Sequence, residues 1–177
     1  MKTVWTDTVD RELPLPEYPR PQMARRNWLN LNGPWSYAIN RSDRFPKAFD
    51  GEIRVPFSPE TELSGVGKKL GHKDYLWYRR EVRLPESFQG RRVLLHFGAV
   101  DQIATVWVNG VQVAHHVGGY LPFEADITGT LGDGTASITV RVSDSSDKSF
   151  HSRGKQSSHR GGIWYTPQSG IWQTVWM

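Results

Sequence analysis

The chain contains no cysteine among its 177 residues. Without cysteine it can form no disulfide framework, no thiolate nucleophile and no zinc site built from cysteine. It also has no apolar run of the length that crosses a membrane, and residues 1–19 carry acidic residues and prolines where a secretory signal needs an apolar stretch. These absences predict a soluble protein with no membrane partner, and they favour a cytoplasmic location.

Helical periodicity is missing as well, since no segment sustains it over three turns. Instead, 17 Gly and 11 Pro interrupt the chain, which suits short strands joined by turns. Eight Trp, seven Phe and six Tyr supply bulky side chains for a core, and the length suits one large all-β domain.

The charge is not strongly of one sign, because the formal net charge is only +4. Basic residues occur in pairs that lie in separate segments with acidic neighbours: Arg25-Arg26, Lys68-Lys69, Arg79-Arg80 and Arg91-Arg92. Scattered pairs favour a solvated surface and no nucleic-acid partner, with a nucleic-acid-binding patch as the alternative.

Residues 1–27 are rich in prolines and charges, which predicts an extended arm lying on a surface. Strand patterning follows at residues 35–39, 52–55, 76–85, 93–97, 104–114, 136–142 and 170–176. Within residues 104–114, Asn109-Gly110 separates two β-branched runs, which is typical of a type I′ hairpin turn. About eight or nine strands without βαβ spacing predict an antiparallel β-sandwich of jelly-roll type over residues 28–177.

Catalytic and ligand motifs are lacking. The phosphate-loop pattern is absent, and none of the six histidines has the spacing of a metal site, so we predict no metal and no cofactor. Several carboxylates lie near predicted strand ends: Asp101, Glu124, Asp126, Asp144 and Asp147. We interpret them as ordinary residues that solvate loops or cap backbone groups.

Several stretches together resemble the N-terminal sugar-binding-like domain of glycoside hydrolase family 2, of the β-galactosidase and β-glucuronidase type. These are residues 76–80 (LWYRR), 98–101 (GAVD), 105–110 (TVWVNG), 118–128 (GGYLPFEADIT), 138–142 (ITVRV) and 169–176 (SGIWQTVW). The resemblance runs from about residue 25 to the end of the chain. It implies a galactose-binding-domain-like jelly roll, followed in full-length members by an immunoglobulin-like domain and a TIM barrel that carries two catalytic Glu.

In those enzymes the acid/base Glu follows an Asn, and this chain has no Asn-Glu dipeptide. We therefore expect a fragment that holds no catalytic residue and is inactive alone, from a retaining hydrolase of O-glycosidic bonds. The expected partners are the parent's own immunoglobulin-like and barrel domains, its carbohydrate substrate and a possible second copy of the parent. An independent carbohydrate-binding module and a purely structural interaction domain are the alternatives.

Family members also extend a loop of this domain toward the active-site mouth, between a strand ending in Ser-Asp and the closing Ser-Gly-Ile. Here Arg153-Gly154-Lys155-Gln156 stands where the familiar β-galactosidases have acidic residues, so only the location of the loop carries over. The candidate substrate-binding residues are Arg153, Lys155, Gln156, Trp164 and Tyr165. We expect residues 150–165 to be mobile and exposed in this chain and an ordered wall in the parent, with a solvated linker as the alternative.

Overall fold

The computed structural model describes residue 4 and residues 6–177. This part of the chain contains eleven strands: β1 (Gly33–Asn40), β2 (Gly51–Val55), β3 (Tyr75–Arg83), β4 (Leu94–Phe97), β5 (Val100–Asp101), β6 (Ile103–Val108), β7 (Val111–Val117), β8 (Phe123–Asp126), β9 (Thr135–Ser143), β10 (Gly170–Ile171) and β11 (Val175–Trp176). Its helical elements are three short 3-10 turns: η1 (Glu86–Phe88), η2 (Thr128–Thr130) and η3 (Ser146–Lys148). No helix in this part is long and apolar enough to cross a bilayer.

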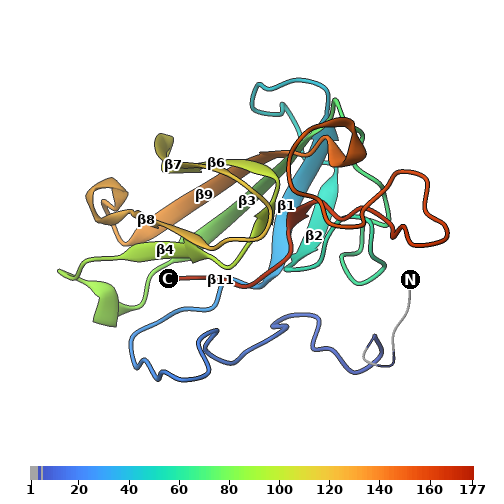
Figure 1. The fold of residues 1–177 in the computed structure, drawn as a ribbon. Coiled ribbons are helices and arrows are strands. Elements are labelled where there is room, and N and C mark those ends of the chain that lie inside the picture. The colour runs from blue at the N-terminus through green and yellow to red at the C-terminus, as the bar shows by residue number, and fades with distance from the viewer. Residues whose placement is uncertain (1–3, 5) are drawn as a thin grey trace.

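The larger layer is a six-stranded antiparallel sheet of order β2-β1-β3-β9-β6-β7 (Figure 1). Its longest pairing joins β3 to β9, from Tyr75 opposite Ser143 to Arg83 opposite Thr135. Alternate residues of these strands, such as Tyr78 and Val140, are fully buried on one face. The period-2 pattern of the sequence therefore sets which face of the sheet builds the core.

The second layer consists of β11-β4-β8 and the short pair β10-β5. The two parts are joined by backbone hydrogen bonds, from Gly98 N to Thr174 O at 2.9 Å and from Trp172 N to Ala99 O at 3.3 Å. Large side chains fill the space between the layers, among them Trp35, Tyr78 and Phe97, all less than 2% exposed. The predicted antiparallel β-sandwich is confirmed.

Two details differ from the sequence prediction. Residues 170–176, predicted as one strand, form β10 and β11 with three residues between them, because Trp172–Thr174 leave the ladder where β4 gives way to β5. Strands β5 and β8 were not predicted separately. A two-residue strand such as β5 is too short to show a period.

The predicted hairpin is confirmed at the turn between β6 and β7. Asn109 and Gly110 both have positive φ, 49° and 82°, as a type I′ turn requires. The Asn109 side chain also fixes the neighbouring segment, since its Nδ2 donates to Thr130 O at 2.9 Å and its Oδ1 accepts from Ser137 N at 2.8 Å.

The described part of the N-terminal segment, residue 4 and residues 6–27, contains neither strand nor helix. It follows the sandwich on the side of β11, as Figure 1 shows. Side chains of the sandwich hold it through backbone carbonyls: Asn32 Nδ2 donates to Pro14 O at 3.0 Å, and Arg54 Nε donates to Arg11 O at 2.7 Å. Residues 1–3 and 5 of the predicted arm lie outside the described residues.

Candidate functional site

Three carboxyl groups meet at one end of the sandwich. Asp101 ends β5, Asp144 follows β9, and Glu60 lies in the loop after β2. Ser169, just before β10, connects two of them, because its N donates to Glu60 Oε2 at 3.1 Å and its Oγ donates to Asp144 Oδ2 at 2.8 Å. The other Asp144 oxygen accepts from Ser146 N at 2.6 Å. We call Glu60, Asp101 and Asp144 the acidic cluster.

Burial controls the electrostatics of the acidic cluster. Asp101 and Asp144 are 4% and 3% exposed. Burial, together with the neighbouring Asp144 and Glu60 carboxylates, raises the pKa of Asp101 to about 7, against a hydrogen bond from Gln156 that lowers it. Burial also raises the pKa of Glu60 and of Asp144. Near pH 7 Asp101 is therefore partly protonated, whereas an exposed aspartate would be ionised.

The backbone packs closely around Asp101. A Cβ on Gly119 would lie 2.5 Å from Asp101 Oδ1, so only glycine fits there. Trp172 Nε1 donates to Gly119 O at 2.7 Å, and the Trp172 ring meets Tyr120 edge-on at 6.2 Å between centroids. Trp172 thus packs against the 118–120 segment and fixes it over the cluster.

Gln156 is the predicted site residue that reaches the acidic cluster. Its Nε2 donates to Asp101 Oδ2 at 3.1 Å and to the Tyr120 hydroxyl at 3.4 Å. Its Oε1 accepts from Gln168 N at 2.6 Å. A single amide side chain therefore connects the loop, the cluster and the segment that leads into β10.

Asp147 holds the same loop from its other side. Its Oδ2 accepts from Ser157 Oγ, Ser158 N and Ser158 Oγ at 3.2, 3.0 and 2.9 Å. The hydrogen bonds from Ser158 lower the pKa of Asp147 to about 2. The base of the loop is thus secured by hydrogen bonds within the chain.

The other four predicted residues lie elsewhere in the loop, and one of them, Tyr165, forms an isolated parallel bridge with Gln156. Arg153 is half-buried, whereas Lys155, Trp164 and Tyr165 are exposed, the two aromatics by 41% and 66%. Tyr165 N donates to Lys155 O at 2.8 Å, so the loop folds back on itself. Within the described chain, the Arg153 and Lys155 side chains have no hydrogen bond or ion pair. The exposure of Lys155, Trp164 and Tyr165 agrees with expectation, and the mobility of the loop stays a prediction.

Asp101 and Asp144 do not solvate loops, because both are buried, although Asp144 does cap a backbone group by accepting from Ser146 N. Asp126 behaves as predicted: it is exposed, accepts from Thr128 N at 3.0 Å and pairs with Arg92 at 2.7 Å. Sequence reasoning overlooked Glu60, which sits in a stretch without periodicity. The only signal at Asp144 was its place directly after a clearly alternating strand.

A small cavity of about 220 Å³ adjoins the acidic cluster on the side of Glu60. Its lining combines cationic, hydroxyl, amide and carboxyl groups: Glu60, Thr61, Lys69, Arg160, Thr166 and Gln168. Such a lining can donate to and accept from a polar ligand. Among the described residues, no three His, Asp or Glu side chains are arranged to hold a metal ion.

Comparisons with known proteins agree with this architecture. Residues 69–176 match the family model described as "Glycosyl hydrolases family 2, sugar binding domain". The chain is 34% identical over 142 residues to a β-glucuronidase of Chlorocebus aethiops, covering 71% of the chain and 22% of the relative. It is 30% identical over 159 residues to a β-galactosidase of Thermoanaerobacter pseudethanolicus, covering 86% and 21%. The chain thus spans about a fifth of the length of these curated relatives.

Solved structures show the same fold. A β-glucuronidase from Faecalibacterium prausnitzii matches with a TM-score of 0.59 at 28% identity, over 90% of this chain and 32% of that one. A β-glucuronidase from Ruminococcus gnavus in complex with D-glucuronic acid matches with a TM-score of 0.64 at 21% identity, over 90% and 30%.

Proposed function

The chain belongs to glycosyl hydrolase family 2, and from that premise we propose that it is the non-catalytic domain of a longer hydrolase of β-linked glycosides. In this proposal residues 28–177 form the sandwich, residues 1–27 are its arm, and separate domains carry the catalytic Glu pair. The β-glucuronidase and β-galactosidase relatives support a glucuronide or a galactoside as the substrate of the whole protein.

The chemistry of the acidic cluster supports a structural role for it. A retaining glycosidase needs two carboxyl groups about 5–5.5 Å apart that flank the sugar, one as acid/base and one as nucleophile. Here Asp144 accepts from Ser146 and Ser169, and Glu60 accepts from Leu70 and Ser169, so both are engaged within the chain. A buried carboxyl group that already binds its own backbone is poorly placed to attack a substrate.

The observation that carries the proposal is the anchoring of the loop. Gln156 binds Asp101 at the strand ends, while Trp164 and Tyr165 of the same loop stay exposed. Further exposed apolar side chains belong to the neighbouring 120–121 segment, with Tyr120 at 45% and Leu121 at 69%. Exposed aromatic rings on a fixed base suit contact with another domain or with the apolar face of a sugar ring.

We propose that this loop forms part of the active-site mouth of the whole protein. Arg153 and Lys155 offer unpaired cationic donors to sugar hydroxyls or to barrel carboxylates, and Gln156 sets the position of the loop. The triple variant Arg153→Ala/Lys155→Ala/Gln156→Ala of the full-length enzyme should lower kcat/KM at least tenfold, by a rise in KM or a fall in kcat.

The matched control removes the same three residue types elsewhere, as Arg44→Ala/Lys47→Ala/Gln89→Ala, all exposed and outside the loop. Both triple variants are assayed against aryl β-glucuronide and aryl β-galactoside, with melting temperatures measured in parallel. Wild-type kinetics in the loop variant would show that the loop is not part of the active-site mouth. Failure of the wild-type full-length protein to hydrolyse any aryl glycoside would contradict the proposal that the whole protein is a glycoside hydrolase.

A further inference from the structure

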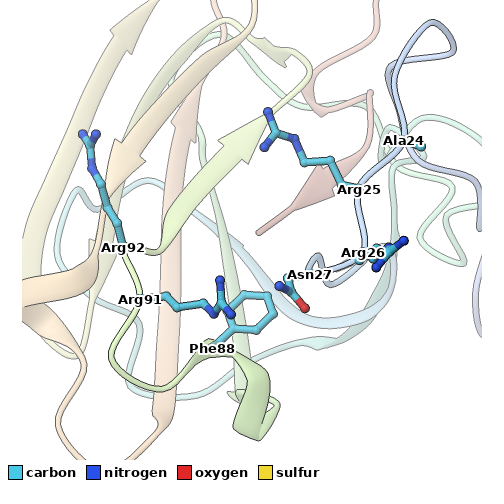
Figure 2. Close-up of a pocket in the computed structure, with 7 residues that line it drawn as sticks. All are labelled: Ala24, Arg25, Arg26, Asn27, Phe88, Arg91 and Arg92. Atoms are coloured by element: carbon cyan, nitrogen blue, oxygen red, sulfur yellow. The ribbon is translucent and has the colours of Figure 1, made fainter.

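Two arginine pairs that are far apart in the sequence lie around one cavity. Arg25 and Arg26 belong to the N-terminal segment, and Arg91 and Arg92 precede β4. The four line a cavity of about 580 Å³ together with Ala24, Asn27 and Phe88 (Figure 2). These two pairs, which lie in separate segments of the sequence, therefore share one surface of the folded chain.

Most of this charge is not neutralised. Arg92 Nε pairs with Asp126 Oδ2 at 2.7 Å, and Arg25 Nε donates only to the Tyr18 hydroxyl at 3.1 Å. The Arg26 and Arg91 side chains have no hydrogen bond or ion pair within the described residues. In Figure 2 the Arg91 side chain runs toward Phe88 and Asn27, and Arg25 extends from the N-terminal segment. Three guanidinium groups without a carboxylate partner favour an anionic ligand.

A second cavity of about 270 Å³ continues the first, and the two share Arg25, Asn27, Phe88 and Arg92. It adds aromatic, imidazole and carboxylate side chains to the lining. His96, Glu124 and Trp176 come from the outer face of β4, β8 and β11, and Trp28 precedes β1. His96 Nδ1 and Glu124 Oε2 lie 3.0 Å apart, and the Glu124 side chain is 60% exposed, so it can accept further hydrogen bonds. We call the combined cavities the arginine groove.

We propose that the arginine groove is a binding site for an acidic oligosaccharide, in which carboxylate groups of the sugar meet Arg25, Arg26 and Arg91. The sugar's hydroxyl groups donate to Glu124 and accept from Asn27, and a pyranose ring lies against the Trp28 indole. The combined size exceeds what a single phosphate or sulfate ion would fill and falls in the range of small-molecule sites.

The mixed lining separates this ligand from other polyanions. A nucleic-acid backbone carries phosphodiesters, which accept but do not donate hydrogen bonds, so it offers no donor to Glu124 in the lining. An acidic peptide offers carboxylates but few hydroxyl groups for Glu124. A sugar acid supplies both carboxylates and hydroxyl groups.

This proposal goes beyond the proposed function, because the groove lies among the N-terminal segment, η1 and β4, whereas Gln156 and the acidic cluster occupy other elements. The two can therefore fail independently. Loss of binding in the groove should leave hydrolysis of a small aryl glycoside unchanged.

The test titrates the 177-residue chain and the full-length protein with tetragalacturonate by calorimetry at low salt. Cellotetraose serves as the neutral sugar, and hexaglutamate and an oligothymidylate serve as the other polyanions. The groove variant is Arg26→Gln/Arg91→Gln, and the matched control is Arg44→Gln/Lys47→Gln on the opposite sheet's loop.

We expect tetragalacturonate to bind both proteins, with affinity that weakens as salt rises. The groove variant should bind at least tenfold more weakly at unchanged melting temperature, and the control should bind as wild type. Equal affinity of wild type and groove variant would overturn the proposal. Binding of hexaglutamate or oligothymidylate as tight as, or tighter than, that of tetragalacturonate would also overturn it. So would binding of tetragalacturonate by the 177-residue chain but not by the full-length protein.

Discussion

The acidic cluster and the arginine groove show opposite ways of arranging charge in one domain. In the cluster, carboxyl groups are buried and hydrogen-bonded to the chain, and their raised pKa values reflect the cost of ionising them there. In the groove, guanidinium groups are exposed and mostly unpaired. We infer that the cluster serves the fold and positions a loop, whereas the groove is free to serve a ligand.

The largest expected effect comes from the tightest packing beside the cluster. Gly170 has φ +78°, and a Cβ there would collide with the Tyr78 hydroxyl and lie 2.9 Å from Leu76 Cδ2. Gly170→Ala should lower the free energy of unfolding by about 4 kcal/mol, since left-handed strain adds to overpacking. Urea denaturation measures the change. Gly129→Ala, in open space, is the control, and similar losses in both variants would contradict this account.

The second effect concerns the pH dependence of stability. Because the folded-state pKa of Asp101 is raised to about 7, the folded state binds a proton more tightly than the unfolded one. The contribution of Asp101 to the free energy of unfolding therefore falls as pH rises from about 4 to 7. Asp101→Asn should remove this loss. The free energy of unfolding of the variant minus that of wild type should therefore be about 3 kcal/mol larger at pH 8 than at pH 4.

The measurement is urea denaturation of both proteins across that range. His96, whose pKa is lowered chiefly by burial, gains stability as pH rises, but it contributes equally to wild type and variant. Asp126 and Asp147 have pKa values of about 2, so their contributions to stability change little above pH 5. Parallel pH profiles for the two proteins would show that Asp101 ionises freely.

A smaller effect is expected at the β6–β7 turn, away from both charged regions. Gly110→Val should cost about 1 kcal/mol, because a β-branched residue resists the positive φ of a type I′ turn. Gly132→Val, at an exposed glycine without positive φ, is the comparison. An unchanged melting temperature for Gly110→Val would show that the turn tolerates a different geometry.

The smallest effect is expected in the groove. Arg26→Gln and Arg91→Gln should each change stability by less than about 0.5 kcal/mol, because neither guanidinium has a partner among residue 4 and residues 6–177. Arg80→Gln is the contrast, since Arg80 NH1 donates to Leu31 O and Asn32 O at 2.8 Å and its pKa is lowered by burial. If the groove variants destabilise as much as Arg80→Gln, the groove is part of the fold.

Much of the sandwich was predictable because its signals are local. The alternation of residues 136–142 predicted β9, and Asn109-Gly110 predicted a turn that the positive φ values confirm. The loop of residues 150–165 could be located by resemblance, and Gln156 was among the residues chosen there. That Gln156 contacts Asp101, while Trp164 and Tyr165 stay exposed, could not be read from the loop itself.

The sequence by itself determined the strand periodicity, the turn chemistry and the absence of any cysteine chemistry. These depend on residues within a few positions of one another, where φ/ψ preference and side-chain alternation act directly. Only the tertiary structure decided that Glu60, Asp101 and Asp144 share one buried end and that Arg25 and Arg91 share one cavity. The burial and charge of these groups depend on neighbours that are distant in sequence, and the pairing of strands sets that proximity.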